Sequence, residues 1–189
     1  MALVRIYSDR DSTTHKTIKD LAEIQAELSK INIAIERWLP ESKLDLEASS
    51  EEILKAYSKQ VSAVMTKHGF LSVDVISMNS SIPAERILEL REKFLAEHIH
   101  RDDEVRYFIE GEGLFCIHQD NAVIQILCEA GDFIAVPANT KHWFDMGDKP
   151  YFKCIRFFGD EHGWIAEYTG DEIAKSFPLI EQFQASLPL

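Results

Sequence analysis

The sequence lacks several features that would place it in common classes of protein. It has three cysteines, Cys116, Cys128 and Cys154, and no CxxC pair, so neither a disulfide framework nor a structural zinc site built on cysteine is expected. The N-terminal segment has no apolar run of signal-peptide length, and no stretch approaches the length of a membrane span. We therefore expect reduced thiols, a cytoplasmic location and no association with a membrane.

Basic residues are also scarce. Lysine and arginine number 20 against 32 aspartates and glutamates, which gives a formal net charge of −12. A nucleic-acid surface needs a basic stripe, and none is visible, so nucleic-acid partners are not expected. The net charge does not exclude any class of small ligand, because a local pocket can differ in sign from the whole chain. It favours a soluble monomer.

The composition that remains is that of one globular domain. The chain has 189 residues, of which 46% are hydrophobic, enough to bury a single good core. Its patterning divides it into a helix-rich half over about 1–95 and a strand-rich part, with a β core over about 70–158 and a last helix over about 171–186. We expect a single domain over 1–189, mainly β, with helices packed against the β core.

The first half alternates between helical and strand patterns. A strand pattern covers 3–7, residues 31–39 fit either a strand or a helix, and another strand pattern covers 70–78. Three helices are predicted from caps and apolar stripes: one after the Thr17/Asp20 pair, one from the Ser49/Glu52 capping box to Gly69, and one that starts at Pro83 and carries Ile87, Leu90 and Phe94.

From His98 onward the hydrophobic period changes to two. Short strands of even spacing with turns rich in glycine, asparagine and aspartate are typical of a sandwich or barrel rather than a parallel sheet. The segment EGEG (residues 110–113) is predicted as one of these turns, and His118, before QDN, as a turn residue. The predicted strands are 97–100, 104–110, 113–118, 122–128, 132–136, 142–145 and 151–158.

The stretch EHIHRDDE (97–104) places His98, His100 and Glu104 close together. In a strand, side chains at i and i+2 share a face, so the two imidazoles can reach one ion, and pairing with the next strand can bring the carboxylate into range. Imidazoles with a carboxylate suit iron, nickel, manganese or zinc. The same residues could equally be exposed histidines beside an acidic turn, and this stretch alone does not distinguish the two.

A second motif downstream favours the metal site. With Gly111, the first stretch has the spacing of the first cupin motif, and Gly131, Pro137 and His142 have the spacing of the second, so the chain resembles the cupin superfamily. The resemblance implies a double-stranded β-helix, or jelly-roll barrel, with His142 as the fourth metal ligand. Three positions depart from the cupin pattern: Glu92, Asn139 and Met146.

Within the cupins, the chain resembles the bacterial acireductone dioxygenase family. The segments that carry this resemblance are EHIHRDDEVRYFIEGEGLFCI, VPANTKHWFDMG and IRFF. It implies one Fe(II) or Ni(II) ion per chain and O2-dependent cleavage of the acireductone 1,2-dihydroxy-3-keto-5-methylthiopentene in methionine salvage. With iron the implied products are 4-methylthio-2-oxobutanoate and formate; with nickel they are 3-methylthiopropanoate, formate and carbon monoxide.

Strand parity identifies the residues expected around the ion. Arg106 shares a face with Glu104 and would stabilise an anionic substrate as a catalytic residue, although an edge strand could instead expose it. Arg156 shares a face with apolar residues, an odd place for a charge unless it meets an anion or a carboxylate. The resemblance supports these two arginines and three aromatic residues as pocket residues; for the aromatics, ordinary core packing is an equal alternative: Phe94, Phe144 and Trp164.

Other features are less specific. Glu97 and Asp102 flank the predicted ligands and could hydrogen-bond an imidazole.

A cupin sugar-phosphate isomerase would use the same metal, but it should carry a cluster of lysine and arginine at the barrel mouth, where only Lys141, Arg106 and Arg156 are candidates. A non-catalytic cupin sensor or storage protein is the other alternative, and a sensor would normally carry a helix-turn-helix partner domain, of which no basic recognition helix is visible.

Overall fold

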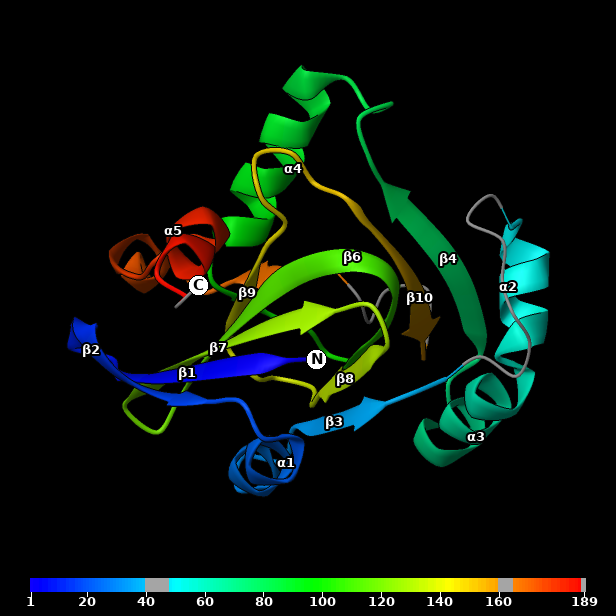
Figure 1. Ribbon diagram of the computed structural model, residues 1–189, viewed down its shortest axis with the longest axis horizontal. Helices are drawn as coiled ribbons and strands as arrows, with labels where there is room; N and C mark the ends of the chain where they lie inside the picture. The colour runs from blue at the N-terminus through cyan, green and yellow to red at the C-terminus, as the bar shows by residue number, and fades with distance from the viewer. Residues whose placement is uncertain (40–47, 160–164, 188–189) are drawn as a thin grey trace.

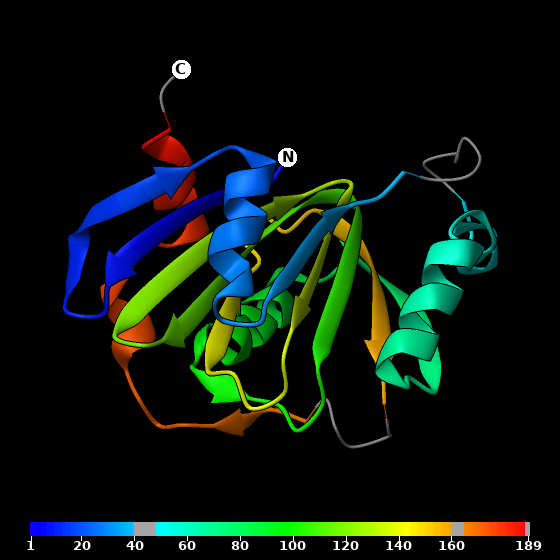
Figure 2. The same ribbon diagram turned by 90° about the horizontal axis from the view of Figure 1, so that it is seen from below.

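Two antiparallel sheets form the centre of the protein. The computed structural model describes residues 1–39, 48–159 and 165–187, and Figures 1 and 2 show the sheets with helices around them. The first sheet has the order β2 (Asp11–Ile18), β1 (Leu3–Ser8), β7 (Ala122–Glu129), β6 (Glu104–Gln119), β9 (His142–Asp145), β5 (His98–Ile99) and β11 (Glu167–Tyr168). The second has the order β3 (Ala34–Arg37), β8 (Asp132–Val136), β6, β10 (Phe152–Phe158) and β4 (Ser72–Met78).

The long strand β6 belongs to both sheets. Its first half pairs with β8 and β10, and its second half pairs with β7 and β9. The predicted turn at 110–113 was therefore wrong, because these residues lie inside β6. The register of β6 with β10 shifts at Ile109, which has no partner on β10, and Gly111, with φ +67°, lies two residues further on. This bulge and the glycine together redirect one strand from sheet to sheet, where a turn would have ended it.

The space between the sheets is filled by apolar side chains from both. Phe108 and Phe115 from β6, Ile126 from β7, Ile134 from β8 and Phe144 from β9 are at most 2% exposed and belong to one hydrophobic cluster. Burial of this surface is the main stabilising contribution to the fold. The predicted class, mainly β with helices packed against the β core, is confirmed; the extent of the single domain stays a prediction.

The helices lie around the sheets. The capping box of Ser49 and Glu52 is confirmed, and Gly69, with φ +71°, ends the second of the two helices that follow. The predicted single helix between them is in fact two, interrupted at Tyr57, where the backbone leaves the helical region. The helices are α1 (Leu21–Ser29), α2 (Ser50–Ala56), α3 (Ser58–His68), α4 (Ala84–Leu95), the 3-10 helix η1 (Ile173–Ser176) and α5 (Ile180–Ala185).

The first half contains more strand than predicted. Residues 11–18 form β2, which was not predicted. Residues 34–37 form β3, so of the two alternatives for 31–39 the strand is the one found. The cap predicted at Thr17 was also wrong: Thr17 lies in β2, and the side chain of Asp20 accepts the Glu23 N–H at the start of α1. β2 is a polar edge strand, exposed over most of its length, so no alternation of apolar residues indicated it.

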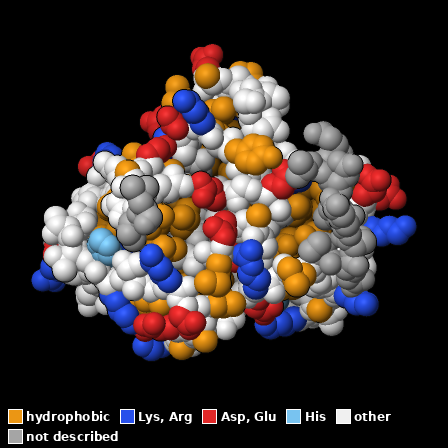
Figure 3. Space-filling model, in the orientation of Figure 1, with side chains coloured by type: hydrophobic (Ala, Val, Ile, Leu, Met, Phe, Trp, Pro, Cys, Tyr) orange, Lys and Arg blue, Asp and Glu red, His pale blue; other side chains and the backbone are white. Residues whose placement is uncertain are grey.

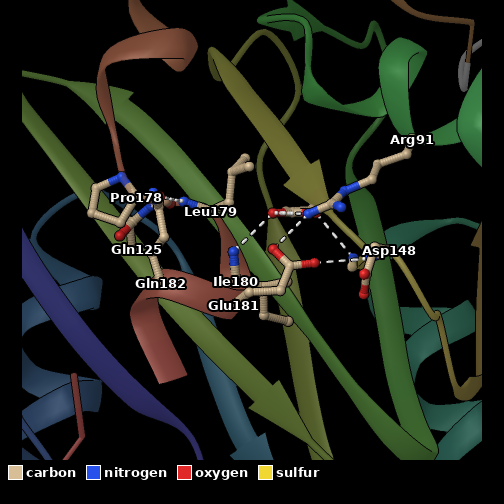
Figure 4. A network of polar contacts seen from close by, with 10 residues as sticks. Arg91, Gln125, Asp148, Pro178, Leu179, Ile180, Glu181 and Gln182 are labelled. Carbon is tan, nitrogen blue, oxygen red and sulfur yellow. Dashed lines mark hydrogen bonds and ion pairs between the residues drawn. The ribbon is translucent and has the colours of Figure 1, made fainter. Parts of the chain in front are cut away.

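The C-terminal segment packs back on the first sheet through a polar network (Figure 4). Arg91 of α4 bonds both oxygens of Asp145 at 2.8 and 3.1 Å and one oxygen of Glu181 at 2.8 Å. The Ile180 N–H donates to Asp145 at 2.8 Å, and Gln125 donates to the carbonyl of Pro178. The predicted single helix over 171–186 was wrong, because the segment consists of η1, a break and α5.

No helix in the described part of the chain is long and apolar enough to cross a membrane.

Candidate metal centre

The four residues predicted as metal ligands converge at one point. His98 of β5 and His142 of β9 are Cα partners on adjacent strands. His100 follows β5 directly, and Glu104 is the first residue of β6. Potential ligand atoms of all four lie within 4.8 Å of one another. These residues could therefore hold a metal ion, and strand pairing is what brings the second motif to the first.

Two of the imidazoles are oriented by the backbone. Nδ1 of His98 lies 2.7 Å from the carbonyl oxygen of Ala96, and Nδ1 of His142 lies 2.8 Å from that of Thr140. A carbonyl only accepts, so each Nδ1 carries a proton, and Nε2 is the nitrogen that each ring can offer to a metal. This tautomer is the one a metal ligand needs.

Burial and the neighbouring charges shift the pKa values of three of these four side chains. Burial, followed by the neighbouring His142, lowers the pKa of His98 to about 4, so this ring is neutral at neutral pH. Burial alone would raise the pKa of Glu104, but Arg106 and the two nearby imidazoles hold that pKa well below its usual range. Burial opposes the charged form of His100, yet the Glu104 carboxylate raises the pKa of this imidazole overall.

The carboxylate of Glu104 contacts two of the imidazoles and one arginine. One of its oxygens lies 2.9 Å from Nε2 of His142 and 3.1 Å from Nε2 of His100. The other oxygen forms an ion pair of 2.7 Å with Arg106. An anion that contacts two imidazoles and a guanidinium occupies the position in which a carboxylate ligand would compensate a divalent ion.

The loop before His142 has the backbone conformation that a cupin glycine would give. Asn139 has φ +61°, a region that asparagine tolerates better than most residues, and its N–H donates to the carbonyl of His100 at 2.7 Å. Asp103 accepts the Ala138 N–H at 2.9 Å and bonds His68 at 3.0 Å. The departure at Asn139 therefore leaves the geometry of the turn intact.

Arg106 lies beside the four clustered residues, as strand parity predicted. Its side chain is 14% exposed, and the guanidinium carbon lies 4.6 Å from the centre of the Phe144 ring and 5.3 Å from that of Phe115. Phe94 of α4 packs edge-on against Phe144, with ring centres 6.4 Å apart. An arginine held by aromatic faces and one carboxylate can still donate from its other N–H groups to a bound anion.

The remaining predicted pocket residues differ from one another. Arg156 is the Cα partner of Arg106 on β10, so it lies on the same face, and it donates to both oxygens of Asp74 at 3.0 and 2.6 Å. The counter-ion of Arg156 is therefore the carboxylate of Asp74. Trp164 lies outside the described residues.

One buried polar group near the site was not predicted. His118 lies in β6 rather than in a turn, and its Nδ1 is 2.6 Å from the fully buried carboxylate of Glu97. The other Glu97 oxygen accepts the hydroxyl of Thr169 at 2.7 Å, directly after β11. Glu97 therefore bonds an imidazole, but not a candidate ligand, and it ties β11 to the strand that carries His98.

Two antiparallel sheets with a cluster of three histidines and one glutamate between strands define a protein of the cupin class with a candidate metal centre. A sequence profile of the ARD/ARD' family matches residues 3–166. The chain is 49% identical to an acireductone dioxygenase of Aquifex aeolicus over 182 residues, which are 96% of this chain and 98% of that protein. It is 46% identical to acireductone dioxygenase 2 of Pectobacterium atrosepticum over 182 residues, 96% of this chain and 99% of that one.

A solved structure is similar as well. It is an acireductone dioxygenase from Bacillus anthracis with a cadmium ion in the active centre, with a TM-score of 0.77 and 29% identity, covering 89% of this chain and 98% of that one. The chain therefore belongs to the ARD/ARD' family. Its relatives are oxidoreductases that act with O2 on a small molecule, and its function is that of an acireductone dioxygenase.

Proposed function

We propose that the chain binds one Fe(II) or Ni(II) ion through His98, His100, Glu104 and His142. It would use this ion to cleave 1,2-dihydroxy-3-keto-5-methylthiopentene with O2 in methionine salvage. The observation that carries the proposal is the convergence of these four side chains within 4.8 Å. Three neutral imidazoles and one carboxylate leave a divalent ion with a charge near plus one. Monomeric state and cytoplasmic location stay predictions from the sequence.

When bound, the ion supplies Lewis acidity for an electron-rich enediolate, and iron can in addition exchange electrons with O2. Arg106 would then donate N–H groups to an anionic substrate oxygen, while its partner Glu104 is compensated by the cation. The ring of Phe144, buried under Arg106, would keep water from the substrate side of the guanidinium. Excluding water strengthens each of these electrostatic contacts.

The aromatic residues and the second arginine would shape the rest of the pocket. Phe94 is partly buried against the core and contacts Phe144, so it could line the end that receives the methylthio tail of the substrate. Arg156, held by Asp74, would contribute positive potential at the rim rather than a direct contact, because its strongest donors already point to a carboxylate. Trp164 is proposed as a further wall of the pocket on the resemblance alone.

The products test the metal proposal. The reaction balances as acireductone plus O2 to 4-methylthio-2-oxobutanoate plus formate, or to 3-methylthiopropanoate, formate and carbon monoxide. We expect the first set from iron-loaded protein and the second from nickel-loaded protein. The experiment is to remove the metal from the protein, reload separate samples of the protein with iron or with nickel, and measure keto acid and carbon monoxide formed from synthetic substrate. The same product mixture from both forms would refute metal-directed cleavage.

A ligand variant tests the site itself. We expect His142→Ala to lose bound metal and activity together, because it removes one Nε2 donor that the backbone holds in place. The matched control is His15→Ala, an exposed histidine on β2, which should keep full metal content. Metal content can be measured by elemental analysis without any assay of turnover. Full occupancy in the His142→Ala protein would remove this residue from the site.

A further inference from the structure

Arg5 is a buried arginine without a carboxylate partner in the described part of the chain. Its side chain lies on β1, and the residue is 3% exposed. Each of the other seven arginines has a carboxylate oxygen within 4.0 Å. Among the described residues, Arg5 contacts neutral groups: the hydroxyl of Ser186, at 2.8 Å, the ring of Phe183, 4.0 Å from its guanidinium carbon, and the neighbouring hydroxyl of Tyr7. A buried charge without a counter-ion is costly, so this position calls for an anion.

The polar atoms around Arg5 are also short of partners. The Nε of Arg5 and the hydroxyl of Tyr7, two residues along the same face of β1, are buried, and neither forms a well-aligned hydrogen bond with any residue that the structure describes. Tyr7 itself is only 2% exposed. Both residues line a cleft of about 420 Å³ between the β1–β2 hairpin and the C-terminal segment, a size that suits a small ligand. Unsatisfied buried donors of this kind are uncommon unless something binds them.

The lining of the cleft has one sign of charge. Hydroxyls of Ser12, Thr13 and Ser186 contribute to it, together with the ring of His15, and none of its described lining residues is a carboxylate. Burial, and after it the charge of Arg5, lowers the pKa of His15. Figure 3 shows histidine and lysine or arginine side chains over the region of β1 and β2 at the left. In a chain with a net charge of −12, such a cleft is an exception.

A second cleft of similar volume provides the contrast. It measures about 390 Å³ and lies on the other side of α5, and its charged lining residues are four carboxylates and one lysine: Glu112, Glu129, Asp148, Glu181 and Lys149. Anions would be repelled there and attracted to the cleft at Arg5. In the sheet, β9, β6 and β7 separate β5, which carries His98, from β1, so the cleft at Arg5 is distinct from the candidate metal centre.

We propose that the cleft at Arg5 is a second binding site, specific for a small oxyanion such as phosphate or the carboxylate of a metabolite. Arg5 supplies the charge and its free Nε–H, and the Tyr7 hydroxyl donates a further hydrogen bond. The hydroxyls of the hairpin complete the set of donors. An oxyanion accepts several hydrogen bonds at once and fits the planar donor fork of arginine.

The test is a calorimetric titration of the metal-loaded full chain with sodium phosphate and, separately, with sodium acetate. Ionic strength is held constant with sodium chloride, because surface charges are screened by salt. We expect one oxyanion per chain to bind saturably, with a Kd on the order of 1 mM or tighter. Saturation by phosphate or by acetate identifies which of the two oxyanions the site prefers, and either result supports the proposal.

Two variants and a control identify the residues. Arg5→Met keeps the length of the side chain without its charge and should weaken binding roughly tenfold or more. Tyr7→Phe removes only a buried hydroxyl that makes no well-aligned hydrogen bond within the described residues, so it should weaken binding by roughly threefold or more while the unfolding temperature stays equal or rises. The control is Arg10→Gln, in the same hairpin with a side chain 88% exposed, which should bind as the unchanged protein does.

The outcomes separate this site from the metal centre. The Tyr7→Phe protein should retain normal metal content and normal turnover of the acireductone, because Tyr7 lies away from the candidate metal centre. The absence of saturable binding for both oxyanions would overturn the proposal, and so would wild-type affinity in both Tyr7→Phe and Arg5→Met. Neither result would affect the assignment of the candidate metal centre.

Discussion

The role of Arg106 can be tested by a substitution that removes its charge and little else. Arg106→Met keeps an unbranched side chain of similar length over the Phe144 ring, from which the guanidinium carbon is now 4.6 Å away. The change removes the 2.7 Å ion pair with Glu104, but a bound divalent ion still compensates that carboxylate. Metal content should therefore stay near normal.

The expected loss lies in the reaction. A hydrogen bond to a charged group contributes about 1.5–3 kcal/mol, and since about 1.4 kcal/mol is tenfold, kcat/KM should fall by about 10- to 100-fold. The assay is steady-state oxygen uptake with synthetic substrate, together with elemental analysis of the same sample. If kcat/KM is unchanged at full metal content, Arg106 does not contact the substrate.

A second arginine controls for damage to the fold. Arg37 pairs with Asp132 at 2.7 Å, and the Asp132 side chain is fully buried. Arg37→Met leaves that buried carboxylate without its counter-ion, with the Glu129 N–H as a remaining donor, so the variant should be destabilised, by about 3 kcal/mol. Its kcat/KM should stay normal below its unfolding temperature, because β3 and the start of β8 lie away from the four clustered residues. A parallel loss of kcat/KM in both variants would mean that Arg106 acts through stability alone.

Three further predictions concern the backbone and the ion. Gly111→Ala should lower the unfolding temperature by about 10 °C, because its Cβ would overlap the backbone of Tyr151. Gly69→Ala has nearly the same φ and no atom within 4 Å of its Cβ, so it should cost only about 1 kcal/mol; equal shifts in a thermal melt would refute the clash. Asn139→Gly should retain metal affinity while Asn139→Val loses it, because valine disfavours φ +61°; a metal titration distinguishes them. Nickel at about 100 times its Kd should raise the unfolding temperature by about 5–10 °C; no shift in a melt with and without nickel would contradict binding to the folded state.

The sequence predicted the candidate metal centre better than the strands that hold it. Glu104 and Arg106 were placed together by parity, which holds in any strand whatever its partners. The alternation rule failed for β2, because an edge strand that is polar on both faces has no alternation to read. It failed at Gly111 for another reason: a glycine between acidic residues is typical of a turn, and only the neighbouring β10 shows that the strand continues through it.

Pairs that are distant in the sequence were beyond prediction for the same reason. Glu97 and His118 are 21 positions apart, and they meet because β5 and β6 both flank β9 in the same sheet. No local pattern distinguishes His118 from a solvated histidine. The sequence could identify Arg156 as an unusual charge among apolar residues, and the structure supplies its partner, Asp74. The same reasoning applied to Arg5 finds no carboxylate among the described residues, so of the two arginines on apolar faces it is Arg5 that still requires an anion from outside the chain.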